Sequence, residues 1–140
     1  MVLLDTDHMS LLERSGPEGA RIRDRLSRVP PDDAATTIVS YEEQMRGWLA
    51  RLAGKQSPHH QFAAYRELKR QLRNYCEVAV VDFDERAIAE FERLKKARIR
   101  IGTMDLKIAA IALANNATLL TRNAVDFGKV PGLQVEDWSL

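Results

Sequence analysis

Hydrophobic residues in this chain fall into two patterns, short apolar runs and longer stretches in which apolar positions recur at helical spacing. The runs predict buried strands, and the recurring positions predict helices that pack by one face. Strands that alternate with helices imply crossover connections and a mostly parallel sheet of about five strands, with helices on both faces. We expect strands at 1–4, 34–39, 78–81, 118–121 and 133–135, and helices at 6–14, 17–29, 40–52, 62–75, 84–97 and 103–115.

Polar and turn-forming residues separate these segments. Pro30–Asp33 ends the second predicted helix, and Gly54–His60 is polar and turn-rich. Ser40 and Glu43 have the spacing of a capping box, and Thr103 is placed to cap the last long helix. No internal repeat or low-complexity tract interrupts the pattern, so we expect one domain over residues 1–140.

Composition narrows the class of protein. The 140 residues are 45% hydrophobic, which is ordinary for a soluble globular domain. No apolar run approaches the roughly 20 residues that span a bilayer. The N-terminus passes from Val2–Leu4 into Asp5 without the basic region of a signal peptide, and Cys76 is the single cysteine, so no intrachain disulfide forms. We therefore expect a cytoplasmic protein without membrane contact.

Basic residues gather in three clusters, although the formal net charge of the chain is only +1. One interpretation is that each cluster is the solvated face of a helix, paired with nearby acids. The other is that the clusters form a positive rim that binds a phosphate backbone. The sequence leaves both interpretations open. The clusters lie at 21–28, 66–73 and 93–100.

Acidic residues stand where predicted strands end or helices begin: Asp5, Glu43, Asp105 and Asp126. At the carboxyl edge of a parallel sheet such residues can converge, and this edge is where α/β proteins bind ligands. Like charges at close range disfavour ionisation, and an oxygen-seeking cation such as Mg²⁺ relieves that conflict. The pattern therefore predicts a metal-dependent enzyme that acts on phosphoryl groups.

Each acid also has a purely structural explanation. Asp5 and Asp7 could cap the first helix, and Glu43 fits the capping box. Asp105 lies in the first turn of its helix, where the helix dipole favours any carboxylate. Asp126 could be a turn residue. Only the joint pattern favours catalysis.

The three histidines are weaker candidates. His59 and His60 fall in the turn-rich stretch and have no partner at the spacing of metal ligands. His8 follows Asp7 in the first predicted helix, where a packed or solvent-facing role is more common. Hydrolysis by a bound metal ion needs no histidine nucleophile.

Two segments resemble the PIN-domain ribonucleases of the VapC toxin kind. The opening segment 3–12 resembles the first acidic motif of that family and contains Asp5. The segment 40–47 resembles the second motif, whose acid lies four residues before a glycine. That spacing selects Glu43.

A third and more specific resemblance brings the match to nearly the full chain. It begins with Ile-Gly-Thr-Met-Asp at 101–105, which ends on Asp105, and its later parts lie at 108–110, 119–123, 126–127 and 130–138. Many members of the family have Asn where this chain has Asp7. The additional carboxylate could join the metal ligands or stay with the helix cap, so Asp7 is kept outside the core set.

The resemblance implies a PIN-like α/β/α sandwich and an endoribonuclease that leaves a 5′-phosphate. It implies dependence on Mg²⁺, with Mn²⁺ as the alternative. It also implies a homodimer and a small antitoxin that blocks the site.

The acids then receive separate roles. Asp5 and Asp105 are expected to bind the metal directly, because each should lie at a strand end or helix start in the middle of the sheet. Glu43 and Asp126 are expected to contact the metal through water or to bind a second ion. Two further residues could orient the acids or contact phosphate, Thr121 and Asn123, the second of which could equally be a helix cap or turn residue.

Two other functions fit parts of the sequence. A phosphatase of the haloacid-dehalogenase type also begins with a strand and Asp-x-Asp, here at 5–7, but needs a later Gly-Asp-x-x-x-Asp loop that the chain lacks. A non-catalytic module that binds RNA or a protein partner would tolerate loss of one acid, whereas all four are present. The sequence leaves open which RNA is cut and whether one or two metal ions bind.

Overall fold

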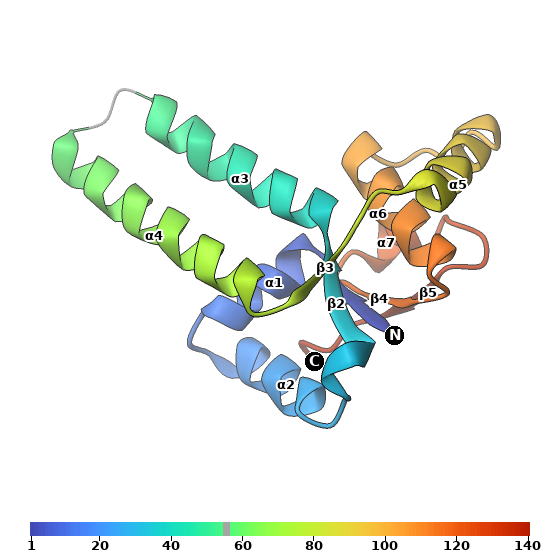
Figure 1. Cartoon of the computed structure of the whole chain (residues 1–140), viewed down its shortest axis with the longest axis horizontal. Coiled ribbons are helices and arrows are strands. Elements are labelled where there is room, and N and C mark those ends of the chain that lie inside the picture. The colour runs from blue at the N-terminus through green and yellow to red at the C-terminus, as the bar shows by residue number, and fades with distance from the viewer. Residues whose placement is uncertain (55–56) are drawn as a thin grey trace.

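A parallel sheet forms the centre of the protein in the computed structural model, which describes residues 1–54 and 57–140 (Figure 1). The strand order is β3-β2-β1-β4-β5, so β1 lies in the middle. Every neighbouring pair is parallel, which requires a crossover connection between the paired strands. The strands are β1 (Val2–Leu4), β2 (Ala34–Thr37), β3 (Ala79–Val81), β4 (Thr118–Leu120) and β5 (Gln134–Glu136).

The sheet separates two hydrophobic cores, because successive side chains of a strand point to opposite faces. In β1, Leu3 belongs to one core and Leu4 to the other, and in β4 the side chains of Leu119 and Leu120 divide in the same way. All four side chains are buried. Both faces of the sheet are therefore covered, and the predicted α/β/α sandwich is confirmed.

Helices α5 (Glu85–Lys96) and α6 (Thr103–Ala114) pack together on one face of the sheet. Helix α6 is apolar around most of its circumference, and residues 108–112 are fully buried. Three of these five residues are alanines, whose small side chains allow the neighbouring elements to approach closely. The apolar α6 thus lies in the interior, with its N-terminal turn at the surface.

The other face of the sheet is covered by α1 (Thr6–Glu13), α2 (Pro17–Leu26) and the C-terminal segment. Met9 of α1 and Ile22 of α2 are completely buried in this second core, and Trp138 joins them from the end of the chain. The first helix and the last residues of the protein therefore share one core.

Helices α3 (Ile38–Ala53) and α4 (Pro58–Cys76) lie side by side and project away from the sheet (Figure 1). Helix α3 begins directly after β2, so its first turns lie at the carboxyl edge of the sheet. Ala64, Gln71 and Tyr75 are the buried residues of α4. The hairpin of α3 and α4 forms one side of the region in which the acids lie.

Three helix starts differ from the sequence prediction. The capping box at Ser40 is wrong, because α3 begins at Ile38 and Thr37 Oγ1 accepts the N–H of Ser40 at 3.0 Å. Thr103 is the first helical residue of α6 rather than its cap. Helix α4 begins at Pro58, inside the stretch predicted to be turn-rich, because the Ser57 side chain caps it. The predicted loop residues 55–56 lie outside the described residues.

Two short helices were not predicted from the sequence, the 3₁₀-helix η1 (Pro31–Asp33) and α7 (Ala124–Phe127). Neither is long enough to show a hydrophobic period. The remaining boundaries agree with the prediction to within three residues. Within the described part of the chain, no helix combines the length and the apolar character needed to cross a membrane.

Candidate active site

Asp5 lies at the carboxyl end of the central strand. Its backbone N–H donates to Leu120 O of the neighbouring strand at 3.0 Å, which continues the sheet by one residue. Its side chain caps α1 by accepting the N–H of His8 at 3.0 Å. Burial raises the pKa of Asp5 to about 7, and the charge of Asp7 adds to this effect, while hydrogen bonds from His8 and Thr121 oppose it. Asp5 is thus a buried carboxyl held both by the sheet and by a helix.

Asp7 is held from two sides. Its Oδ1 lies 2.7 Å from Nδ1 of His8, and its Oδ2 accepts the N–H of Arg122 at 3.2 Å. Although burial raises the pKa of Asp7, the hydrogen bonds from His8, Asp5 and Arg122 lower it below the ordinary value. Asp7 is therefore an ionised carboxylate beside the more readily protonated Asp5.

His8 is completely buried, and both nitrogens of its ring are engaged. Nδ1 faces the Asp7 carboxylate, and Nε2 accepts the backbone N–H of Trp138 at 3.1 Å. Burial lowers the pKa of His8, whereas Asp5 and Asp7 raise it to about 9. A protonated ring would place a hydrogen on Nε2 against the N–H of Trp138. The neighbouring acids favour a protonated ring, but the 3.1 Å contact with the Trp138 N–H is possible only for the neutral ring with its hydrogen on Nδ1, and we assign the neutral ring on this geometry.

Glu43 reaches the site from the second turn of α3. Thr6 Oγ1 donates to Glu43 Oε1 at 2.7 Å, so α1 and α3 are joined directly across the site. The early start of α3 at Ile38 places Glu43 beyond the capping position that the sequence suggested for it. Its carboxylate is therefore oriented by a residue from another helix.

Asp105 lies in the first turn of α6 and is partly buried. Burial raises the pKa of Asp105, and the charges of Glu43, Asp126 and Asp7 raise it further. A like-charge effect of this kind requires the carboxylates to lie near one another. The charges of Glu43, Asp126 and Asp7 thus act on Asp105. Within the described part of the chain, the acids whose potential ligand atoms lie within 4.8 Å of one another are Asp5 and Asp7, grouped with His8.

Asp126 and its neighbours complete this edge after β4. Asn123 caps α7, because its Oδ1 accepts the N–H of Asp126 at 3.3 Å, and its Nδ2 donates to Asp126 Oδ2 at 3.1 Å. This side-chain hydrogen bond lowers the pKa of Asp126, as does the charge of Lys129. Thr121 is buried and its Oγ1 accepts the N–H of Asn123 at 3.0 Å. A chain of contacts thus links the end of β4 to the Asp126 carboxylate.

The family model of the PIN domain matches residues 2–133 of this chain. The chain belongs to the PIN-domain family. The resemblance inferred from the three sequence segments is confirmed, and a phosphatase of the haloacid-dehalogenase type is set aside.

Known relatives of this PIN domain agree with the family model over almost its full length. Ribonuclease VapC1 of Haemophilus influenzae (strain R2866) is 29% identical over 142 aligned positions, which cover 98% of this chain and 97% of the relative. A chain of the VapBC-1 structure from nontypeable Haemophilus influenzae has a TM-score of 0.73 and 26% identity, with all of both chains covered. The VapBC-5 structure from Mycobacterium tuberculosis, a member of the VapBC family of toxin–antitoxin systems, has a TM-score of 0.61 and 23% identity over 96% of this chain and 94% of that one.

Asp7 and His8 are the site residues of this PIN domain that sequence reasoning left out. Within the described part of the chain, potential ligand atoms of Asp5, Asp7 and His8 lie within 4.8 Å of one another. His8 is not free to bind a metal, because both ring nitrogens already have partners. The remaining candidates at this edge are carboxylate oxygens, the ligands preferred by Mg²⁺ and Mn²⁺. The donor set therefore fits a hard divalent cation.

Proposed function

We propose that this protein is a metal-dependent endoribonuclease. The observation that supports the proposal is the raised pKa of Asp105, which burial causes together with the charges of three other carboxylates. A protein does not gather acids in this way for stability, because their mutual repulsion disfavours the folded state. A divalent cation would offset this repulsion, so metal binding explains why the acids lie near one another.

The comparisons support an RNA substrate rather than another phosphodiester. The relative with 29% identity over nearly the whole chain is a ribonuclease. The acid arrangement supports hydrolysis of a phosphodiester, and this relationship supports RNA as the substrate. We propose Asp5, Glu43, Asp105 and Asp126 as the catalytic acids, with Thr121 and Asn123 as supporting residues.

Asp5 and Asp105 would hold the cation directly, with Glu43 and Asp126 as further or water-mediated ligands. Asp7 is a fifth carboxylate at the same edge. When bound, Mg²⁺ or Mn²⁺ supplies Lewis-acid polarisation of the phosphoryl oxygens and lowers the pKa of the attacking water.

The remaining residues of the site keep these acids in place. Thr6 fixes the Glu43 carboxylate through its 2.7 Å hydrogen bond, and Asn123 fixes Asp126. His8 holds Asp7, and the Trp138 backbone holds His8 in turn. Orientation of ligands by such second contacts is a general feature of metal sites and contributes strongly to affinity.

The test of this proposal is cleavage of RNA by purified protein free of any partner. We expect cleavage with Mg²⁺ or Mn²⁺, and none with EDTA. Asp105→Asn should abolish cleavage while the fold is retained. Asp32→Asn is the matched control, because Asp32 is exposed and precedes β2 at the opposite edge of the sheet. Equal cleavage by wild type and Asp105→Asn would contradict the proposed role of Asp105, and a protein that binds RNA without cleaving it under any metal would be a binding module.

We further propose that the protein is the toxin of a toxin–antitoxin pair. Solved VapBC structures with the same fold support this role. The α3–α4 hairpin also exposes large apolar side chains, among them Leu49, Phe62 and Tyr65, each more than half exposed. An amphipathic segment of an antitoxin could cover them. Co-expression with the product of the neighbouring gene should give copurification and loss of cleavage. The homodimer and the cytoplasmic location stay predictions.

A further inference from the structure

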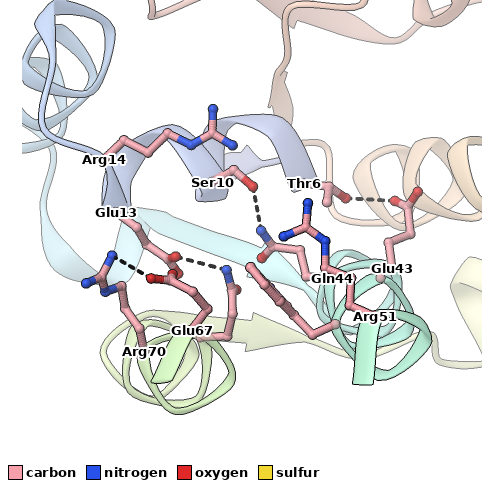
Figure 2. A pocket seen from close by; sticks show the side chains of 12 residues that line it. Thr6, Ser10, Glu13, Arg14, Glu43, Gln44, Arg51, Glu67 and Arg70 are labelled. Atoms are coloured by element: carbon pink, nitrogen blue, oxygen red, sulfur yellow. Dashed lines mark hydrogen bonds and ion pairs between the residues drawn. The ribbon is translucent and has the colours of Figure 1, made fainter. Parts of the chain in front are cut away.

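A cleft of about 410 Å³ opens beside the acids, between α1, α3 and α4 (Figure 2). Thr6 and Glu43, which are joined by a hydrogen bond, form its end nearest the acids. From there the cleft extends along α3 to Trp48 and Arg51, and along α4 to Arg70. A molecule bound at the inner end of the cleft would therefore contact Thr6 or Glu43 at the acidic edge.

The inner wall of this cleft contains hydrogen-bond acceptors that have no partner among the described residues. Gln71 is 3% exposed and donates its Nε2 to Glu13 Oε2 at 2.9 Å, which leaves Oε1 of both residues without a partner. Gln44 is 8% exposed and donates its Nε2 to Ser10 Oγ at 2.6 Å, which leaves its own Oε1 without a partner.

Buried acceptors without partners are unfavourable and rare in native proteins, so each needs an explanation. Here three of them lie on residues that line one cleft. The carboxylate of Glu13 accepts from Gln71, which fixes the end of the Gln71 amide that is the oxygen, whereas the hydroxyl of Ser10 can donate or accept and does not fix the amide of Gln44. The part of the inner wall formed by Glu13 and Gln71 is therefore suited to a group that donates two hydrogen bonds.

The rim of the cleft contains cationic side chains. Arg51 lies over the Trp48 ring at 4.9 Å, and Arg70 pairs with Glu67 at 3.2 Å. Outside the rim, Arg70 continues into a basic hollow on α4 that is formed by Arg66, Lys69, Arg70 and Arg73. An arginine or lysine side chain from a protein partner would have to pass these cations. A nucleotide fits both parts, because its base donates hydrogen bonds and its phosphates are anionic.

We propose that this cleft binds one base of the RNA substrate at its end away from Thr6 and Glu43, and that Glu13 and Gln71 select guanine there. The assignment rests on the proposed ribonuclease function and adds its base specificity. The base would lie on the inner wall of the cleft, with Trp48 as an aromatic surface for stacking. The adjoining phosphates would follow the basic hollow on α4.

Guanine is selected by the number and position of its donors. The free oxygens of Glu13 and Gln71 belong to two side chains that are hydrogen-bonded to each other. Two neighbouring acceptors match two neighbouring donors. Only guanine offers this on its pairing edge, through N1–H and the N2 amino group. Adenine, cytosine and uracil each place one donor group between or beside ring or carbonyl acceptors, which would face the inner wall unfavourably.

The experiment has a cleavage arm and a binding arm. In the first, a pool of short single-stranded RNAs with a randomised segment is cut with Mg²⁺ or Mn²⁺, and the new ends are sequenced. In the second, fluorescence anisotropy with Ca²⁺ compares an oligonucleotide carrying guanine at the selected position with one carrying inosine, which lacks only the N2 amino group. Wild type, Glu13→Gln and Gln71→Met are compared, with the exposed positions Glu18→Gln and Gln134→Met as matched controls.

We expect guanine to be enriched at one fixed position relative to the cut. We also expect wild type and both controls to bind the guanine oligonucleotide roughly tenfold more tightly than the inosine one. Glu13→Gln and Gln71→Met should lose both preferences and still cleave the pool in a metal-dependent manner. Glu13→Gln keeps an acceptor for Gln71, so it tests selection even if Gln71→Met fails to fold.

Each contrary result identifies a different failure. Cleavage without a base preference, or a preference that both variants retain, overturns the assignment of the cleft and leaves the ribonuclease intact. If the variants retain the base preference but no longer copurify with the co-expressed product of the neighbouring gene, the cleft belongs to the protein partner instead. A wild-type protein that cuts no RNA with any divalent metal overturns the proposed function, and the base-selection assignment with it.

Discussion

The His8 ring accepts a hydrogen bond from the backbone N–H of Trp138, 130 residues later in the chain, at 3.1 Å. Through this bond the last residues of the protein are attached to the helix that Asp5 caps. The same ring holds the Asp7 carboxylate on its other side. One buried imidazole therefore connects the fold to the acidic edge of the sheet.

Replacing His8 should destabilise the protein. His8→Ala leaves a cavity and removes the partners of the buried Trp138 N–H and of Asp7, so we expect the free energy of unfolding to fall by about 2–4 kcal/mol. Urea unfolding with EDTA present measures this. His59→Ala is the matched control, because His59 is exposed on α4, and it should change stability by less than about 0.5 kcal/mol. Equal stability of His8→Ala and wild type would contradict a structural role for the ring.

The buried Asp5 carboxyl should make the metal-free protein less stable as pH rises. Its pKa is about 7 in the folded protein and 3.8 when unperturbed, so between these values the folded state holds a proton that the unfolded state has released. Rising pH then favours unfolding. Asp5→Asn retains the helix cap and removes the titration. We expect the variant to gain stability relative to wild type from about pH 4 to about pH 7, whereas a difference that is constant with pH would contradict the burial effect.

Divalent cations should stabilise the folded protein through the same acids. A cation present at about 100 times its dissociation constant raises the free energy of unfolding by about 2.7 kcal/mol. We expect Mg²⁺ or Mn²⁺ to raise the melting temperature of wild type and of Asp32→Asn by the same amount. Asp105→Asn should show a much smaller rise, because it removes one proposed ligand. A full rise in Asp105→Asn would exclude this residue as a ligand.

The basic hollow on α4 should contribute more to RNA binding than the basic cluster at the end of α5. Arg66, Lys69 and Arg73 are exposed beside the proposed base-binding cleft. Reversing all three charges should make the fall of log affinity with log salt less steep by about 2, as expected for three lost contacts to single-stranded phosphates.

The comparison is charge reversal at Arg93, Lys95 and Lys96 of α5. Arg93 is already paired with Glu90 at 2.6 Å, so this cluster resembles a solvated helix face. We expect only a small change in the salt slope. A larger change from the α5 reversal than from the α4 reversal would place the RNA path on the other side of the protein.

Much of the fold could be predicted from the sequence, because apolar periodicity reports which face of an element is buried. The capping box at Ser40 failed for a specific reason. Thr37 is also a good cap, and both residues precede the same apolar pattern. The choice between them depends on where β2 ends in the sheet. Glu43 is then held by Thr6, a contact across 37 residues that local spacing does not contain.

The candidate site shows the same limit of local sequence patterns. The positions of Asp5 and Asp105 follow from strand ends and helix starts. The importance of His8 does not, since its burial depends on Trp138 at the other end of the chain. The acceptors of the proposed base-binding cleft are similarly non-local, because Glu13 and Gln71 lie 58 residues apart and meet only where α1 packs near α4.

The central claim is that the acids act through a metal ion that contacts the scissile phosphate. The most direct measurement uses RNA with sulfur in place of one non-bridging oxygen of that phosphate. Mg²⁺ binds sulfur poorly, whereas the softer Mn²⁺ tolerates it better. We predict that one sulfur isomer is cut slowly with Mg²⁺ and that Mn²⁺ restores its cleavage. Equal cleavage of both isomers and of unmodified RNA with Mg²⁺ would contradict contact between the metal and the phosphate.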